Sequence, residues 1–353
     1  MKALLGDLVN IKTGKLDANQ ADENGKYPFF TCSKEISKIN SYSYDCECVL
    51  IAGNGDLNVK YYNGKFEAYQ RTYILTSTDV NTLSNKYLYW FMNRYIVQLR
   101  NQSIGGVIKY IKLGDLTNIT LNLPTLDVQR RIVEIFESIE RLIGTKVFIL
   151  KGLDDLIKSR FVEIFGVFNI NPNNYNTIKF RDLIEQNNIN EEDIVWLLNL
   201  DMIKPNTGEI VEKVYIDRQN IPTSSISFKK GTVLYSKLRP YLNKVVIADE
   251  NGYGTSELIP LNSYKNGLTA EYLAYYLRQD SFVEYIKDKV TGAKMPRVAM
   301  DILRNIDIIQ PNYIYQEQFS GFVNHINKLK SDVQKSIDET QLLMDSLMQE
   351  YFG

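Results

Sequence analysis

The sequence predicts a mixed α/β (α+β) protein in which two globular parts alternate with two long helices. An internal repeat is the first sign, because Phe165-Gly166 recurs 187 positions later as Phe352-Gly353. Apolar residues after position 126 are spaced by three and four, which is typical of a coiled-coil helix. Short runs rich in β-branched and aromatic residues precede each such helix and predict strands.

The repeat keeps one register over the later part of each half. Pro124 and Pro311 share the offset of 187, as do Gln129 and Gln316. Further pairs at this offset are Gly105 and Gly292, Leu116 and Leu303, and Asn118-Ile119 and Asn305-Ile306. A register that holds without a gap predicts two copies of one structural unit. Two such units suit a partner with two matching sites, and DNA is the obvious candidate.

Composition narrows the class of protein. The 353 residues suffice for two domains with a core each. Hydrophobic residues make up 44% and charged residues 24%, which is usual for a soluble globular protein. Because the net charge is −1, any nucleic-acid surface must be a local basic patch. No apolar run is long enough to span a membrane, and the clustered Cys32, Cys46 and Cys48 suit reduced thiols, so a cytoplasmic protein is expected.

Residues 1–123 are predicted to form the first globular part. Its strand-like runs are short and are separated by Gly, Asn and Asp. They are Cys48–Ala52, Val59–Asn63, Arg71–Thr76 and Asn118–Leu123. Asn63-Gly64, placed between two such patterns, predicts a hairpin turn. Ser84 is expected to cap a helix that stops near Gly105-Gly106.

The long helices are predicted over residues 124–166 and 311–353, with Gly144-Thr145 as a weak place in the first. A helix of about 40 residues is roughly 60 Å long. Such a helix cannot bury its apolar seam within a small domain, so the two are predicted to pair antiparallel as a coiled-coil spacer. The second globular part is expected over residues 167–310, of which 167–176 form a linker. Its predicted elements are strands at Gly231–Leu238 and Lys244–Asp249 and a helix at Ala270–Val290.

The most specific motif runs from Gly231 to Asn262 and reads GTVLYSKLRPYLNKVVIADENGYGTSELIPLN. The first half holds a sister form, CVLIAGNGDLNVKYYNGKFEAYQRTYIL. Each half then leads to a Pro-x-Leu-x-x-Gln-x-x-Ile pattern, complete at Pro124–Ile132 and lacking Leu and Ile after Pro311. With these motifs present twice, the chain resembles the DNA-specificity (S) subunit of type I restriction-modification systems over nearly its whole length.

The resemblance implies that each globular part is a target recognition domain that reads one half of a bipartite DNA site. It implies that the helices set the unread spacer and dock two methyltransferase (modification) subunits, to which restriction and translocation subunits can be added. S-adenosylmethionine would be bound by the methyltransferase subunits, and this chain would need no cofactor of its own. A non-catalytic role agrees with the residues, since His325 is the one histidine and no Asn/Asp-Pro-Pro-Tyr/Phe motif occurs.

Reading DNA requires donors at base edges and cations at phosphates. Residues 229–244 form the densest basic run and include no Asp or Glu. The candidate DNA contacts of the second part are Lys229, Lys230, Lys237, Arg239, Tyr241, Asn243, Lys244, Lys294 and Arg297. Those of the first part are Lys60, Lys65, Gln70, Arg71, Lys109 and Lys112. No catalytic residue and no metal site is expected.

Alternatives remain both for the role of each single residue and for the function of the whole chain. Each cation taken singly can be an ordinary surface residue, and Arg239-Pro240 can serve the backbone of a turn. The chain as a whole can also be a coiled-coil scaffold whose globular parts bind proteins without reading DNA. Its near-neutral charge favours the scaffold, whereas the paired globular parts and the recurring motif argue against it.

Overall fold

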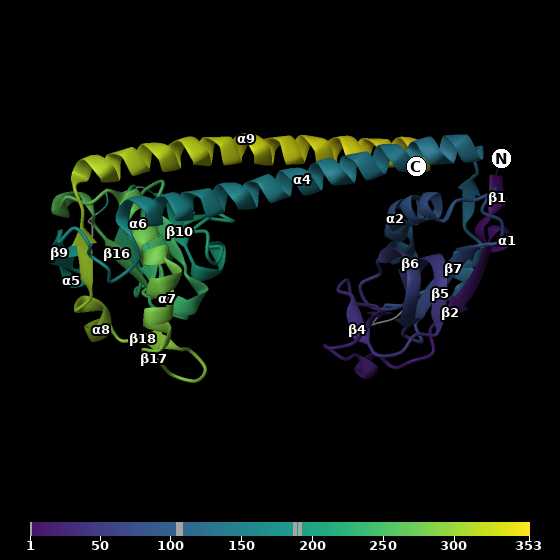
Figure 1. The fold of residues 1–353 in the computed structure, drawn as a ribbon, viewed down its shortest axis with the longest axis horizontal. Helices are drawn as coiled ribbons and strands as arrows, with labels where there is room; N and C mark the ends of the chain where they lie inside the picture. The colour runs from purple at the N-terminus through teal and green to yellow at the C-terminus, as the bar shows by residue number, and fades with distance from the viewer. Residues whose placement is uncertain (1, 104–108, 186–188, 190–192) are drawn as a thin grey trace. The chain divides into compact units, whose positions relative to one another are not determined.

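The computed structural model describes residues 2–103, 109–185, 189 and 193–353 (Figure 1). The chain divides into two compact units. Unit 1 comprises Met1–Val147 and Lys335–Gly353, and unit 2 comprises Phe148–Gln334. Each unit therefore contains one globular part together with a segment of each long helix.

The globular part of unit 1 is built on a six-stranded sheet in the order β2-β7-β5-β6-β3-β4. Its pairings are antiparallel except between β3 and β6, which run parallel. Helix α2, Asn85–Gln102, lies against β5 and β6 (Figure 1). The strands are β2 Val9–Thr13, β3 Tyr27–Phe30, β4 Ser37–Ile39, β5 Tyr44–Ala52, β6 Val59–Ala68 and β7 Thr72–Ser77. The short helix η1, Ala18–Gln20, lies between β2 and β3 in the chain.

Alternation along β5 separates the core of this part into two layers. Val49 and Ile51 are buried on the side of α2, in a cluster that includes Trp90. Cys48 and Leu50 are buried on the opposite face of the sheet. This period of two is what a strand buried on both faces requires.

A small two-stranded sheet ties the beginning of the chain to the segment that leads into the first long helix. Strand β1, Lys2–Leu4, pairs antiparallel with β8, Thr120–Asn122. The short helices α1, Leu5–Leu8, and α3, Leu113–Thr117, pack on each other beside it. Helix α2 ends at Gln102; Gly105 and Gly106, near which it is predicted to stop, lie outside the described residues.

The globular part of unit 2 contains a four-stranded sheet, β11-β10-β15-β12, and a three-stranded sheet, β14-β13-β16. Two strand pairs, β9 with β19 and β17 with β18, complete it. The strands are β9 Asn176–Lys179, β10 Ile194–Leu198, β11 Val214–Asp217, β12 Ile226–Phe228, β13 Val233–Ser236, β14 Val245–Ile247, β15 Gly252–Gly254, β16 Leu258–Leu261, β17 Val290–Thr291, β18 Arg297–Val298 and β19 Asp307–Gln310. The helices are α5 Phe180–Leu183, η2 Leu200–Met202, η3 Arg218–Asn220, η4 Pro240–Leu242, η5 Tyr264–Asn266, α6 Ala270–Arg278, α7 Asp280–Lys287 and α8 Met300–Arg304.

The predicted long helices are confirmed as α4, Leu126–Phe165, and α9, Tyr313–Phe352. Helix α4 is one continuous helix through Gly144 and Thr145. In unit 1, Phe136 stacks on Phe352 at 5.8 Å and Lys146 Nζ donates to Thr340 Oγ1 at 2.7 Å. Residue numbers rise along α4 as they fall along α9, so the two segments pair antiparallel.

The same antiparallel pairing holds within unit 2. Lys330 Nζ lies 2.5 Å from a carboxylate oxygen of Asp154. Further along, Phe161 makes an edge-to-face contact with Phe319 at 5.3 Å. The predicted fold class, with its two globular parts and its paired long helices, is confirmed.

The internal repeat is visible in equivalent hydrogen bonds. Tyr87 Oη donates to the carbonyl of Asn122 at 3.2 Å, and Tyr272 Oη donates to that of Ile309 at 2.8 Å. Both tyrosines are buried, one in α2 and the other in α6. Each bond fixes the helix of a globular part to the strand that leads into its long helix.

Two local predictions are wrong. Asn63-Gly64 is not a turn but lies inside β6, where these residues pair with Glu47 and Cys46 of β5. The turn between β5 and β6 lies earlier in the chain, at residues 53–58. Of Asn63 and Gly64, only Gly64 has a positive φ. The predicted helix over Ala270–Val290 is broken at Gln279, whose extended backbone separates α6 from α7.

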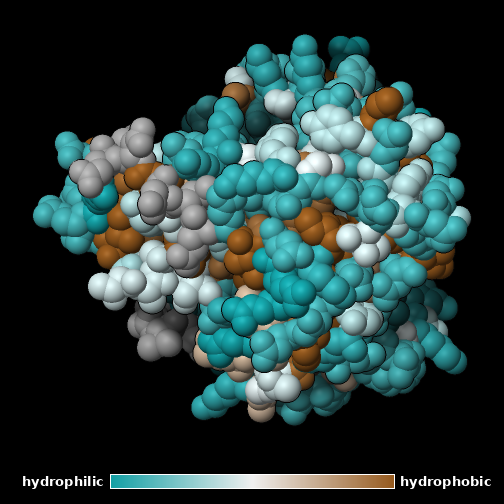
Figure 2. Space-filling model, turned by 90° about the vertical axis from the view of Figure 1, so that its left-hand side faces the viewer, coloured by the Kyte–Doolittle hydropathy of each residue, from teal (hydrophilic) through white to brown (hydrophobic). Residues whose placement is uncertain are grey.

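The face of the protein shown in Figure 2 is mostly hydrophilic, with smaller hydrophobic areas between the polar side chains. Among the described helices, none combines the length and apolar character needed to cross a lipid bilayer.

Candidate nucleic-acid interface

The loop that follows β5, residues 53–58, is held by backbone hydrogen bonds to two other segments of unit 1. Gly53 N donates to Arg71 O at 2.8 Å, and Gly55 N donates to Lys109 O at 2.8 Å. Ile111 N donates back to Gly53 O at 3.0 Å. We call residues 53–58 the first loop. Its backbone is thereby fixed between β7 and the segment before α3.

The loop that follows β13, residues 237–244, is held in the same way in unit 2, and we call it the second loop. Lys237 N donates to Glu257 O at 3.0 Å, and Arg239 N donates to Pro296 O at 2.8 Å. Val298 N donates to Lys237 O at 3.1 Å. The isolated bridges Asn54 with Tyr110 and Leu238 with Arg297 occur at matching places. The two loops are therefore equivalent positions of the repeat.

A left-handed residue stands at the same place in each loop. Gly55 has φ of 72°, and Arg239 has φ of 46°. Glycine adopts this region freely, whereas another residue pays on the order of 1–2 kcal/mol. The second loop thus keeps a long cationic side chain where backbone conformation favours glycine. Arg239 is exposed, so that charge is directed to the surface.

Three candidate contacts of the second part lie together around this loop. Arg239 and Tyr241 are exposed on the loop itself. Lys294 is exposed two residues before Pro296, the acceptor of the Arg239 amide. This group supplies the cations and the phenol that DNA recognition uses.

The basic run 229–244 is not one patch. Lys229 and Lys230 are exposed, but they precede β13, and the second loop follows it. Four strand residues separate the groups by roughly 13 Å. Lys230 N donates to Asn251 Oδ1 at 3.0 Å. The two lysines therefore belong to the opposite end of the strand from Arg239.

Asn243 and Lys244 of the second loop bind neighbouring segments of unit 2. Asn243 is 4% exposed, and its Nδ2 donates to Arg278 O at 2.9 Å. Lys244 Nζ donates to Leu200 O at 2.5 Å, and burial lowers the pKa of this lysine. Lys237 is half-buried. The burial of Asn243 argues against a direct DNA contact by its side chain.

Arg297 is tied to a carboxylate. Its Nε lies 3.0 and 3.1 Å from the two carboxylate oxygens of Glu257, and one terminal nitrogen lies 2.7 Å from Oε1. The hydrogen bond to Glu257 raises the pKa of Arg297. This salt bridge engages two nitrogens of the Arg297 guanidinium, and the carboxylate of Glu257 cancels the charge of Arg297.

The candidate contacts of the first part divide similarly. Lys60 is bound internally, since its Nζ donates to Ser33 O at 2.7 Å and also to the Asn58 side chain. Gln70 Nε2 donates to Asp17 Oδ1 at 2.8 Å. Lys65, Arg71, Lys109 and Lys112 are exposed. Lys65 Nζ lies 4.8 Å from the centre of the Tyr42 ring.

The first loop also carries an acidic residue that the sequence does not connect with any partner. Asp56 lies 3.0 Å from Lys34 Nζ and 3.4 Å from an Arg100 nitrogen. The hydrogen bond from Lys34 is the main cause of a lowered pKa at this carboxyl. Lys34 and Arg100 are thereby placed at the first loop, although they are distant from it in sequence.

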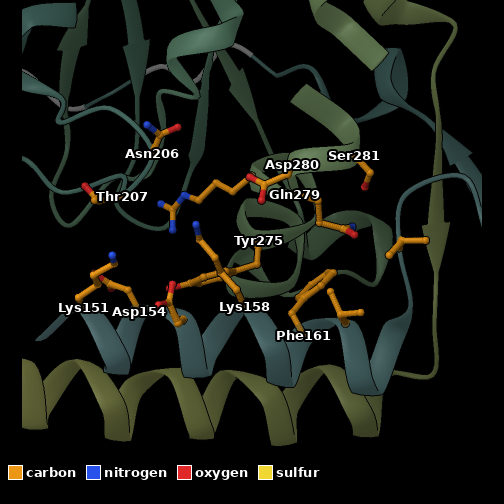
Figure 3. A pocket seen from close by; sticks show the side chains of 14 residues that line it. Lys151, Asp154, Lys158, Phe161, Asn206, Thr207, Tyr275, Gln279, Asp280 and Ser281 are labelled. Carbon is orange, nitrogen blue, oxygen red and sulfur yellow. The ribbon is translucent and has the colours of Figure 1, made fainter. Parts of the chain in front are cut away.

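Unit 2 contains a pocket of about 420 Å³ between α4 and the junction of α6 and α7 (Figure 3). Phe161 and Lys158 reach into it from α4, and Tyr275 from α6. Arg278 lies with its guanidinium 5.0 Å from the Tyr275 ring and donates to Val245 O at 2.9 and 2.6 Å. The pocket therefore lies where α4 meets the helices α6 and α7 of the second globular part.

Residues 2–154 match the family described as "Type I restriction modification DNA specificity domain". The chain is 27% identical over 392 positions to the type I restriction enzyme EcoDI specificity subunit of Escherichia coli, which covers 98% of this chain and 85% of that protein. It is 25% identical over 171 positions to the type I restriction enzyme MjaIX specificity subunit of Methanocaldococcus jannaschii, covering 45% and 37%.

Two solved structures share the fold. The S subunit of the type I restriction-modification system from M. genitalium has a TM-score of 0.60 and 13% identity, and the match covers 100% of this chain and 96% of that one. A chain from work on complex assembly and conformational transition of the type I system has a TM-score of 0.61 and 13% identity, covering 100% and 97%.

The specificity-domain match covers the first globular part and the beginning of α4, and the fold of two globular parts with paired long helices is shared with a solved S subunit. The chain carries a type I restriction-modification DNA specificity domain over residues 2–154 and is similar over nearly its whole length to a specificity subunit of such a system. The predicted resemblance is thus confirmed, and it supports a role in DNA sequence specificity.

Proposed function

We propose that each globular part reads one half of a bipartite DNA sequence and that the two long helices set the spacer between the halves. The proposal rests on one arrangement that occurs in both parts, namely a loop whose backbone is hydrogen-bonded to two other segments. We call this arrangement the loop constellation. The first loop is bound at Arg71 and Lys109, and the second loop at the equivalent Glu257 and Pro296. Two copies of one reading edge suit two half-sites on one duplex.

The proposed contacts are the exposed candidates near the two loops. In the second part they are Arg239, Tyr241 and Lys294, and in the first part Arg71 and Lys109. Cations at these edges would neutralise phosphates and so give a strong dependence of affinity on salt. Lys65, Lys112, Lys229 and Lys230 are also exposed and are proposed as secondary phosphate contacts.

The helices are proposed to dock two methyltransferase subunits, which would bring S-adenosylmethionine and the catalytic groups, while this chain catalyses nothing. Apolar side chains on the paired helix segments of unit 1 support docking. Leu142, Val147, Leu342 and Leu343 are between 47% and 70% exposed there. Large apolar side chains exposed along a helix pair are one feature of protein interfaces. The pocket beside Phe161 offers a further apolar recess on the helix side of unit 2.

Exchange of one recognition domain tests the proposal. Residues 177–309 would be replaced by the corresponding segment of a relative, and the chimera would be expressed with its methyltransferase subunit. Long-read sequencing then maps the methylated positions. We expect one half-site to change while the other half and the spacer persist. The reciprocal exchange of residues 1–123 is the matched control. A change in both half-sites after either single exchange contradicts the proposal.

A further inference from the structure

Equivalent positions of the two loop constellations carry opposite kinds of side chain. Arg71 and Glu257 are equivalent, because each offers its carbonyl to the first residue of its loop. Tyr110 and Arg297 are equivalent, because each forms the isolated bridge to its loop. An acid and an arginine in the second part are thus replaced by an arginine and a tyrosine in the first.

In the second part, the acid and the arginine at these two positions, Glu257 and Arg297, form a salt bridge with each other. Glu257 precedes β16, and Arg297 begins β18. Their side chains are 17% and 40% exposed, and they meet at 2.7 Å. The pair links the strand on one side of the second loop with the strand on the other. The charge of Arg297 is cancelled there, whereas Arg239 and Lys294 are exposed cations near that loop.

In the first part, the arginine has no such partner. Arg71 is exposed, and within the described ranges of the chain its side chain forms no ion pair with a carboxylate. Tyr110, in the position of Arg297, is half-buried and brings no charge. Lys109, the neighbour of Tyr110, is exposed. A guanidinium whose donors are uncommitted keeps its capacity for two-pronged binding to guanine or phosphate.

We propose that Arg71 contacts DNA directly in the first recognition domain, whereas Arg297 is a positioning residue that fixes the second loop through Glu257. In the second domain, the direct contact at this edge comes from Arg239 instead. The arginine proposed to contact DNA therefore lies beside the loop in the first domain, as Arg71, and on the loop itself in the second domain, as Arg239. The inference rests on the proposed function and assigns residues within it.

Arg71→Ala tests the first half of the inference. The variant would be assembled with its methyltransferase subunits, and binding to a duplex carrying the wild-type motif would be measured at several salt concentrations. We expect affinity to fall at least tenfold while the melting temperature stays unchanged, because the side chain is exposed. Arg130→Ala removes another exposed arginine of unit 1 and serves as the control. Unchanged affinity together with an unchanged methylation motif overturns the assignment of Arg71.

Arg71→Lys distinguishes the two kinds of DNA contact. If Arg71 binds a phosphate, lysine preserves most of the affinity and the motif, and the alanine variant shows a salt slope reduced by about one. If Arg71 reads a base, lysine relaxes the first half-site at one position. Both results support a direct contact, and a lysine variant matching an unaffected alanine variant contradicts it.

A charge swap tests the positioning role of Arg297. Arg297→Ala is expected to weaken binding through the second half-site, and the double variant Glu257→Arg/Arg297→Glu is expected to restore most of it by rebuilding the pair. If the swap binds as poorly as Arg297→Ala, Arg297 itself contacts DNA and the inference is wrong. Failure of the proposed function is a separate result, since wild-type protein would then show no split motif.

Discussion

Gln129 and Gln316 are buried at equivalent places near the starts of α4 and α9, and their amides make matching hydrogen bonds. Gln129 Oε1 accepts from Ser84 N at 2.9 Å, while its Nε2 donates to Thr82 O at 2.8 Å and to Pro124 O at 3.0 Å. The amide therefore joins the N-terminus of α2 to the segment that enters α4.

Gln316 repeats this junction in unit 2. Its Oε1 accepts from Thr269 N at 2.9 Å, and its Nε2 donates to Gly267 O at 3.2 Å and Pro311 O at 2.8 Å. Thr269 is the N-cap of α6, as Ser84 is that of α2. One side chain thus fixes the direction in which each long helix leaves its recognition domain.

Gln316→Ala is expected to destabilise the protein by about 2–4 kcal/mol, because it leaves a buried amide and two carbonyls without their partner. Thermal unfolding followed by circular dichroism measures the loss. Gln318→Ala is the matched control, since Gln318 is exposed two residues further along α9. Equal melting temperatures for the two variants would show that the junction contributes nothing.

Phe165→Ala is expected to cost about 3–5 kcal/mol of stability, because the ring is 9% exposed and packs on Tyr272 at 4.8 Å and Phe319 at 5.6 Å. Phe148→Ala is the control on the same helix. Phe148 is 75% exposed, so its loss should change stability by less than about 0.5 kcal/mol. Denaturant unfolding compares the two, and similar losses would contradict the packing described for the end of α4.

A matched pair of heptad insertions tests the helices as a spacer. One heptad would enter α4 between Lys146 and Asp154, and one would enter α9 between Lys330 and Thr340. Both flanking contacts are kept, since Lys146 binds Thr340 and Lys330 binds Asp154. Seven residues add about 10 Å, so the unread spacer should lengthen by about three base pairs with both half-sites unchanged.

Insertion into α4 alone is the control for this experiment. It shifts the register of one helix against the other and should lower stability without producing a longer spacer. Retained methylation with the original spacer after the matched insertions would rule out the helices as the determinant of spacing.

Lys60→Met is expected to leave the methylation motif unchanged, because the ammonium is bound inside the first domain. Burial lowers the pKa of Lys60 from its ordinary value of 10.5. The charged form is thus disfavoured in the folded state, and this group makes stability rise as the pH rises through its lowered pKa toward 10.5. The melting temperature of the wild type, measured against pH, should show this rise, and Lys60→Met should lose it. An altered methylation motif in this variant would show that Lys60 contacts DNA after all.

The long helices and their boundaries could be predicted because their signal is local. Apolar residues at spacings of three and four run through the predicted range 124–166, and the structure has the helix at Leu126–Phe165, within that range and continuous through Gly144 and Thr145. The turn at Asn63-Gly64 could not be predicted correctly, since β6 continues through these residues by pairing with β5. Tertiary pairing overrode a local turn signal there.

The charged residues near the loops could be predicted as a set but not sorted into their roles. Arg297 and Lys294 look alike in sequence, yet Arg297 meets Glu257 across 40 positions and Lys294 is exposed. Asn243 lies within the basic run and is nevertheless buried against Arg278. Such pairings depend on three-dimensional contacts between segments far apart in sequence, which neither composition nor periodicity encodes.

The central claim is that one chain reads two half-sites at a fixed separation. The most direct measurement is co-purification of the wild-type chain with its methyltransferase subunit, followed by long-read mapping of methylated DNA. The account predicts a stable complex and a methylation motif of two short, different half-sites around an unread gap of constant length. A complex that methylates a single continuous motif, or that forms without yielding any split motif, would contradict it.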